Sequence, residues 1–144
     1  MNVTPDLQSS LTCDDVRQER NGKFMLIGLF DAIGAPRFPM RHGRLFVVTR
    51  WCSGEGRFEQ STRIVRPDQV TPIATSRPVA LNLSTPEAVA THVDLFVNLA
   101  FPEPGVYWVE ILLNGDLRIR YPLRVNHLQH DPGKSPFPAD SAEP

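Results

Sequence analysis

The chain has 144 residues, of which 41% are hydrophobic and 22% are charged, and its formal net charge is −1. This length and composition suit one globular domain that buries a core without metals or disulfides, and they exclude a wholly disordered chain. The charge balance gives no excess of lysine and arginine with which to neutralise a run of phosphates. We therefore expect no nucleic-acid partner.

The sequence gives no sign of a membrane segment or a secretory leader. No window approaches the ~20 apolar residues that a transmembrane helix needs. The opening residues "MNVTPDLQSSLTCDDV" lack the basic start and apolar run of a signal peptide. We expect no membrane partner and a cytoplasmic location, with Cys13 and Cys52 as free thiols and a disulfide between them as the alternative.

The first elements in chain order are short strands. We expect a flexible segment over residues 1–10, a strand over residues 11–16 and a tight turn at Asn21-Gly22. Residues 23–31, "KFMLIGLFD", are almost continuously apolar, which predicts a strand buried on both faces in the middle of a sheet. The prolines and glycines of residues 32–43 predict an irregular crossing between two sheets.

The remaining elements are also expected to be strands. Residues 44–52 and 57–65 predict a hairpin, and Pro72 and Pro78 break the next residues into short edge pieces. In residues 91–101 the alternation predicts one core face. The side chains expected on that face are Val93, Leu95, Val97, Leu99 and Phe101. Two further arms, residues 105–113 and 117–125, alternate in polarity on either side of Asn114-Gly115, and in the second arm Leu117 is expected on the apolar face.

The absence of helical periodicity requires that a second sheet cover these apolar faces. We therefore expect an all-β fold, an antiparallel two-layer β-sandwich of immunoglobulin-like type, over residues 11–128. Tyr107 after a Pro-Gly pair resembles the tyrosine corner of such sandwiches. Residues 129–144 are rich in proline, serine and acids, which predicts a disordered tail.

Three stretches carry a family resemblance: "LTCDDVRQERNGKFMLIGLFDAI", "FPMRHGRLFVVTRW" and "LFVNLAFPEPGVYWVEILLNGDLRIRYPLRV". Their Cys-Asp start, "GLFD" strand end and closing "PLRV" resemble a bacterial family of uncharacterised single-domain proteins. The resemblance implies a cytoplasmic domain of unknown function. It supplies no catalytic residue.

One face of the last arm is a candidate partner-binding surface. Arg118, Arg120 and Arg124 are expected in a row that receives an acidic ligand or protein, with a solvated face as the alternative. Phe96 and Trp108 lie opposite the main apolar stripes of their strands. An exposed aromatic patch is one interpretation, and cover by the loops of residues 34–43 or 67–78, or of both faces of the sheet, is the favoured one.

Metal binding is the main chemical alternative. His127 and His130 lie three residues apart beside Asp131, and Cys13, His42 and His92 are further candidate ligands. No Cys-x-x-Cys pair or phosphate-binding loop is present, so we expect no cofactor and assign no catalytic residue. The favoured function is a non-catalytic binding module for an unknown protein or acidic ligand. The alternatives are a metal-dependent enzyme or sensor with a His and Cys site, and a self-associating structural domain, which allows a homodimer.

Overall fold

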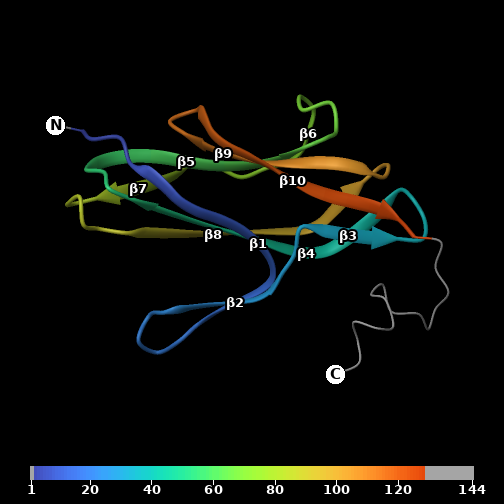
Figure 1. The fold of residues 1–144 in the computed structure, drawn as a ribbon, viewed down its shortest axis with the longest axis horizontal. Helices are drawn as coiled ribbons and strands as arrows, with labels where there is room; N and C mark the ends of the chain where they lie inside the picture. The colour runs from blue at the N-terminus through green and yellow to red at the C-terminus, as the bar shows by residue number, and fades with distance from the viewer. Residues whose placement is uncertain (1, 129–144) are drawn as a thin grey trace, which may run out of the picture.

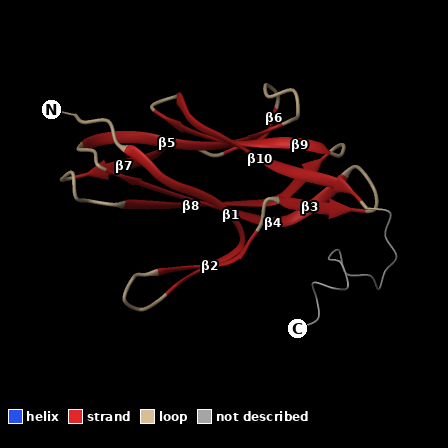
Figure 2. Cartoon of the chain, in the orientation of Figure 1, coloured by secondary structure: helices blue, strands red, loops and turns tan. Residues whose placement is uncertain are grey.

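Two β-sheets lie one above the other and contain all the strands of the described residues (Figures 1 and 2). The structure is a computed structural model, and it describes residues 2–128. The first sheet has the strand order β2-β1-β4-β8, and the second has the order β3-β10-β9-β5-β6, with β7 also paired to β5. The predicted all-β fold with two sheets is confirmed.

The described residues form ten strands. Their bounds are β1 Asp6–Gln18, β2 Phe24–Leu29, β3 Ala32–Ala35, β4 Met40–Cys52, β5 Gly56–Val65, β6 Pro72–Thr75, β7 Val79–Leu83, β8 Ala90–Phe101, β9 Gly105–Leu113 and β10 Asp116–His127. Within residues 2–128, no helix is long and apolar enough to cross a membrane.

The core lies between the two sheets, where side chains from both inner faces meet. Alternate residues of β4, such as Leu45, Val47 and Trp51, pack against Tyr107 and Ile111 of β9. The ring of Tyr107 meets Phe101 edge to face, with 4.9 Å between centroids. Its hydroxyl donates to the Glu103 carbonyl at 2.7 Å, so the polar group of this buried side chain has a hydrogen-bond partner at the start of β9.

Several expectations about the first strands are wrong. β1 begins at Asp6, and Val3 forms a bridge with Glu55, so part of the segment expected to be flexible is paired. Residues 32–35 form β3, which pairs in parallel with β10, so the sheets are not wholly antiparallel. The chain does cross between the sheets here, but only residues 36–39 are irregular. The prolines at 36 and 39 marked the crossing, and β3 was missed because four residues carry little periodicity.

The predicted core face of β8 is correct for only half of the strand. Asp94 and Phe96 are buried before Asn98, whereas Leu99 and Phe101 are buried after it, and Leu95 and Val97 are exposed. Asn98 takes a left-handed conformation with φ of 53°, and the inward side of the strand changes at this residue. A strict period of two cannot anticipate such a change.

The loop between β5 and β6 is organised by Asp68. Its carboxylate accepts hydrogen bonds from the Val70 and Thr71 amides at 2.8 and 2.9 Å and from the Thr71 hydroxyl at 2.6 Å. These hydrogen bonds, that of the hydroxyl first, lower the pKa of Asp68 from 3.8 to about 2.

We predict that this loop contributes to the pH dependence of folding. Because the pKa of Asp68 is lowered on folding, the stabilisation is complete above its unfolded value and is lost as the pH falls toward about 2. Urea denaturation between about pH 4 and about pH 2 is expected to show a smaller loss of stability for Asp68→Asn than for the wild type. Asp116→Asn, at an exposed turn carboxyl, is the control, and an equal effect of both variants would contradict the prediction.

Candidate functional site

A hollow among the described residues lies on the outer face of the first sheet, away from the core. The β1–β2 hairpin leaves the body and arches below β4 and β8 (Figure 1). The groove that it forms has a volume of about 680 Å³, which is within the usual range for ligand sites. Its lining comes from β1, β2, β4 and the start of β8: Ser9, Leu11, Asn21, Gly22, Lys23, Phe24, Leu26, Val48, Arg50, Val89 and Thr91.

The hairpin turn follows from the Asn21-Gly22 pair. Gly22 takes a φ of 91°, and its amide donates to the Glu19 carbonyl at 2.9 Å. The Asn21 side chain accepts from the Lys23 amide at 3.0 Å. Turns of this kind favour Asn and Gly because positive φ costs them little. The sequence therefore places the turn correctly.

The expectation that residues 23–31 form a buried central strand is wrong. β2 is at the edge of the first sheet, and five of its six residues are exposed. Phe24, Met25, Ile27 and Leu29 retain between 39% and 58% of their surface. The apolar run reports hydrophobic side chains on both faces, but it does not report whether another layer covers them. Here the hairpin projects from the first sheet on the side that faces away from the second sheet (Figure 2).

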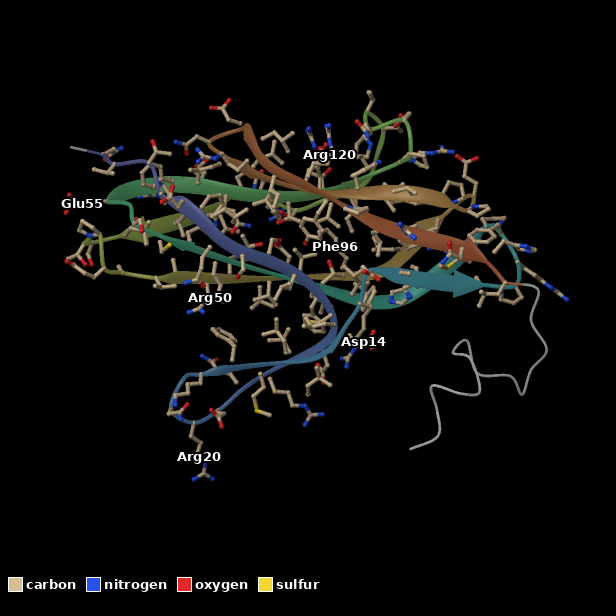
Figure 3. All side chains as sticks on the ribbon, in the orientation of Figure 1. Asp14, Arg20, Arg50, Glu55, Phe96 and Arg120 are labelled. Atoms are coloured by element: carbon tan, nitrogen blue, oxygen red, sulfur yellow. The ribbon has the colours of Figure 1, made fainter. Side chains whose placement is uncertain are left out.

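The groove combines apolar walls with positive charge. Arg50 lies on the outer side of β4 and points toward the hairpin (Figure 3), with its Nε donating to Thr91 Oγ1 at 3.1 Å. Lys23 is the second cation at the groove, and its lining contains no Asp or Glu among the described residues. A carboxylate beside apolar groups matches this environment.

The apolar surface extends from the groove along β4 and β8. The pairs Arg50/Thr91, Val48/Val93, Phe46/Leu95 and Arg44/Val97 succeed one another in register on the outer face. Leu95 and Val97 are 50% and 64% exposed. The six steps along β8 from Thr91 to Val97 span about 20 Å. We call this surface, from Thr91 to Val97 with its β4 partners, the outer track.

The scan against protein families adds one finding to this geometry. Residues 8–126 match the model of a family of unknown function, DUF6941. The chain belongs to the DUF6941 family. The predicted resemblance to an uncharacterised single-domain family is thus confirmed, whereas the bacterial source stays an expectation. No curated protein matches the chain.

The arginines singled out in the sequence of this DUF6941 chain do not form a continuous row. A register shift between Leu117 and Ile119 interrupts β10 at Arg118, which instead donates to the Pro5 carbonyl at 3.4 Å. The same irregularity leaves Leu117 exposed, against expectation. The polarity pattern could not show a one-residue bulge beside the Asn114-Gly115 turn.

Arg120 is already engaged by a buried carboxylate. Glu110 is fully buried on the outer side of β9, and it pairs with Arg63 of β5 and with Arg120 Nε at 2.6 Å. Arg120 also donates to Gln69 at 3.2 Å. It points away from the groove, on the far side of the second sheet (Figure 3). Arg124 is exposed on the same strand and makes none of the salt bridges found within residues 2–128.

Phe96 and Trp108 do not form one aromatic patch in this DUF6941 domain. Phe96 is buried between the sheets (Figure 3), because the inward side of β8 is the one opposite to that expected. Trp108 is partly buried on β9, beside Val65 and Pro122 in the ladder. Phe96 is therefore covered by the second sheet and not by a loop, and Trp108 is partly covered.

The candidate metal ligands lie apart and have other partners. His42 is stacked at a tilt near Phe30, His92 contacts Asp94 and His127 contacts the Pro36 carbonyl. Among residues 2–128, no three His, Cys, Asp or Glu side chains are grouped as a metal site would require. His130 and Asp131 lie outside the described residues.

A buried chain of polar side chains was missed in the sequence. Trp51 Nε1 donates to Gln60 at 3.0 Å, Gln60 donates to Thr62 at 3.3 Å, and Thr62 donates to Asp94 Oδ2 at 2.5 Å. His92 Nε2 contacts the other Asp94 oxygen at 2.9 Å. The alternation of β8 placed Asp94 on the solvated face, so no local signal showed that this acid lies opposite Val47 and is buried.

We predict that this buried chain stabilises the fold. Thr62→Val keeps the shape of the side chain but leaves the buried Asp94 and Gln60 groups without the hydroxyl, which is expected to cost about 1–3 kcal/mol. Urea denaturation of Thr62→Val measures this loss. Thr75→Val, at an exposed position of β6, is the matched control. Equal stabilities of the two variants would contradict a role for the buried hydroxyl.

The two cysteines differ in accessibility, and both are free thiols. Cys13 is fully buried, its thiol donates to the Asp15 carbonyl at 3.4 Å, and burial is the main cause that raises its pKa. Cys52 is partly exposed at the end of β4.

We predict that thiol reagents modify Cys52 first and Cys13 only after denaturation, because reaction requires both access and the thiolate. Mass spectrometry of alkylated native protein measures this order. Cys52→Ser is expected to remove the fast reaction and Cys13→Ser to preserve it. Equal labelling of both thiols in the native protein would show that the region around Cys13 opens.

Proposed function

We propose that this DUF6941 domain is a non-catalytic interaction module whose groove binds an extended segment of a partner protein. The segment would present apolar side chains to the outer track and a carboxylate to Arg50. The observation that carries this proposal is the groove with partly apolar walls and Arg50 at its side, open to solvent and without an acid in its described lining.

The length of the surface favours a protein segment over a compact ligand. The groove continues into the outer track, where Leu95 and Val97 are exposed beyond the groove itself. A small molecule seated at Arg50 would leave these side chains in water, whereas an extended chain lying along β8 would cover both. Exposed apolar areas rimmed by polar groups are typical of protein contacts.

Charge gives the segment its expected chemistry. Arg44 at the other end of the outer track is paired with Asp15 at 3.4 Å and lies over the Phe46 ring. Arg50 has a neutral partner in Thr91, so its guanidinium keeps donors for an incoming acid. A segment with its carboxylate near one end is therefore the best match.

Two finer expectations belong to the same proposal. The Tyr107–Glu103 hydrogen bond supports an immunoglobulin-like arrangement, because sandwiches of that type use such a tyrosine at a strand entrance. The free thiols of Cys13 and Cys52 support a reducing, cytoplasmic location.

An apolar anion is a direct probe of the groove. We predict that anilinonaphthalene sulfonate fluoresces on binding to the wild type, and that Arg50→Glu weakens this binding by about tenfold because attraction becomes repulsion. Arg50→Lys is expected to restore most of it. Arg124→Glu, at an exposed arginine of the second sheet, is the charge-matched control and is expected to have little effect. Equal binding by all four proteins would refute the groove as the site.

Selection from a random peptide library tests the partner chemistry. The wild type is expected to enrich peptides with an acid and alternating apolar residues, and Val97→Glu is expected to lose them because it places a like charge on the outer track. Enrichment of basic peptides, or of the same peptides by both proteins, would refute the proposed segment.

A further inference from the structure

The free edge of β2 is an unusual surface for a protein to leave open. β2 ends the first sheet, and its residues Phe24–Leu29 include no proline and no charged residue. Natural edge strands are commonly protected by such residues, because unpaired amides and carbonyls are templates for another strand. Here the unpaired edge coincides with exposed Met25, Ile27 and Leu29.

We propose that a second copy of this chain pairs along β2, forming a symmetric antiparallel dimer. A two-fold contact requires a strand that is complementary to itself. Centred on Ile27, antiparallel pairing of β2 with its copy would bring Lys23, which precedes the strand, near Asp31 of the other copy, which follows it. Both residues are exposed, and the residues between them are apolar apart from Gly28. The apolar contact would therefore have a pair of unlike charges, one lysine and one aspartate, at each end.

The C-terminal residues of the chain are a poorer occupant of this edge. Residues 129–144, "QHDPGKSPFPADSAEP", carry prolines at 132, 136, 138 and 144, and a proline has no amide to donate to a ladder. Their only large apolar residue is Phe137. By contrast, β2 offers several apolar side chains to its own copy.

This inference goes beyond the proposed groove, because the two surfaces are different parts of the hairpin. The dimer uses the backbone edge of β2, whereas the groove is lined by side chains of β1, β4 and β8 as well. Lys23 borders both, and Arg50 remains the cation of the groove. Loss of one function therefore does not require loss of the other.

Sedimentation velocity of the full chain over the micromolar range tests the dimer. The wild type is expected to show a concentration-dependent shift from monomer to dimer. Ile27→Lys places two ammonium groups side by side at the centre and is expected to weaken the dimer by at least about tenfold. Val97→Lys, at an equally apolar exposed site on β8, is the matched control and is expected to dimerise normally.

A charge exchange tests the register. Lys23→Asp and Asp31→Lys are each expected to weaken the dimer several-fold, and the double variant is expected to restore it because the unlike pairs are re-formed. Thermal unfolding verifies that each variant is folded. A monomeric wild type throughout the range, dimerisation of Ile27→Lys like the wild type, or failure of the double variant to recover would overturn the proposed pairing. The anilinonaphthalene sulfonate assay on the monomeric Ile27→Lys protein separates this result from the groove.

Discussion

The first sheet carries apolar side chains on both faces, while the second sheet covers only one of them. Leu45, Val47 and Trp51 turn inward from β4, and Phe46 and Val48 of the same strand turn outward. Apolar burial drives this fold, so the sandwich buries the inner face, whereas the outer face keeps apolar side chains such as Leu95 and Val97 exposed. The hairpin of β1 and β2 supplies some cover for Val48, which is 3% exposed, but it exposes its own apolar residues in doing so.

Polar contacts inside the sandwich make the alignment of the two sheets specific. The chain from Trp51 to Asp94 joins β4 and β8 of the first sheet to β5 of the second. At another point Ser10 of β1 bonds the Tyr121 hydroxyl of β10 at 2.9 Å, and burial raises the pKa of this phenol. Sliding one sheet over the other would break both sets of contacts and leave buried polar groups without partners.

The limits of prediction from the sequence are clearest at β2 and β10. Strand type and the Asn21-Gly22 and Asn114-Gly115 turns could be predicted, because alternation and turn residues are local properties. The exposure of β2 could not, since an apolar run has the same appearance whether a neighbouring layer covers it or not. Likewise, the sequence predicts that Arg120 is available for a partner. In the structure it is bonded to Glu110, which lies ten positions earlier in the chain and opposite it in the β9–β10 pair. The groove exists because the β1–β2 hairpin lies away from β4 and β8. No local sequence pattern predicts this position of the hairpin.

The left-handed residue in β8 has a consequence for how this sequence can change in length. Asn98 lets one strand bury Phe96 and Leu99 on the same side although they are three positions apart. Deleting or inserting a single residue between them would expose the buried side chains, and bury the exposed side chains, along the rest of the strand. A change of length is therefore expected to be tolerated better in the connecting loops than between Phe96 and Leu99.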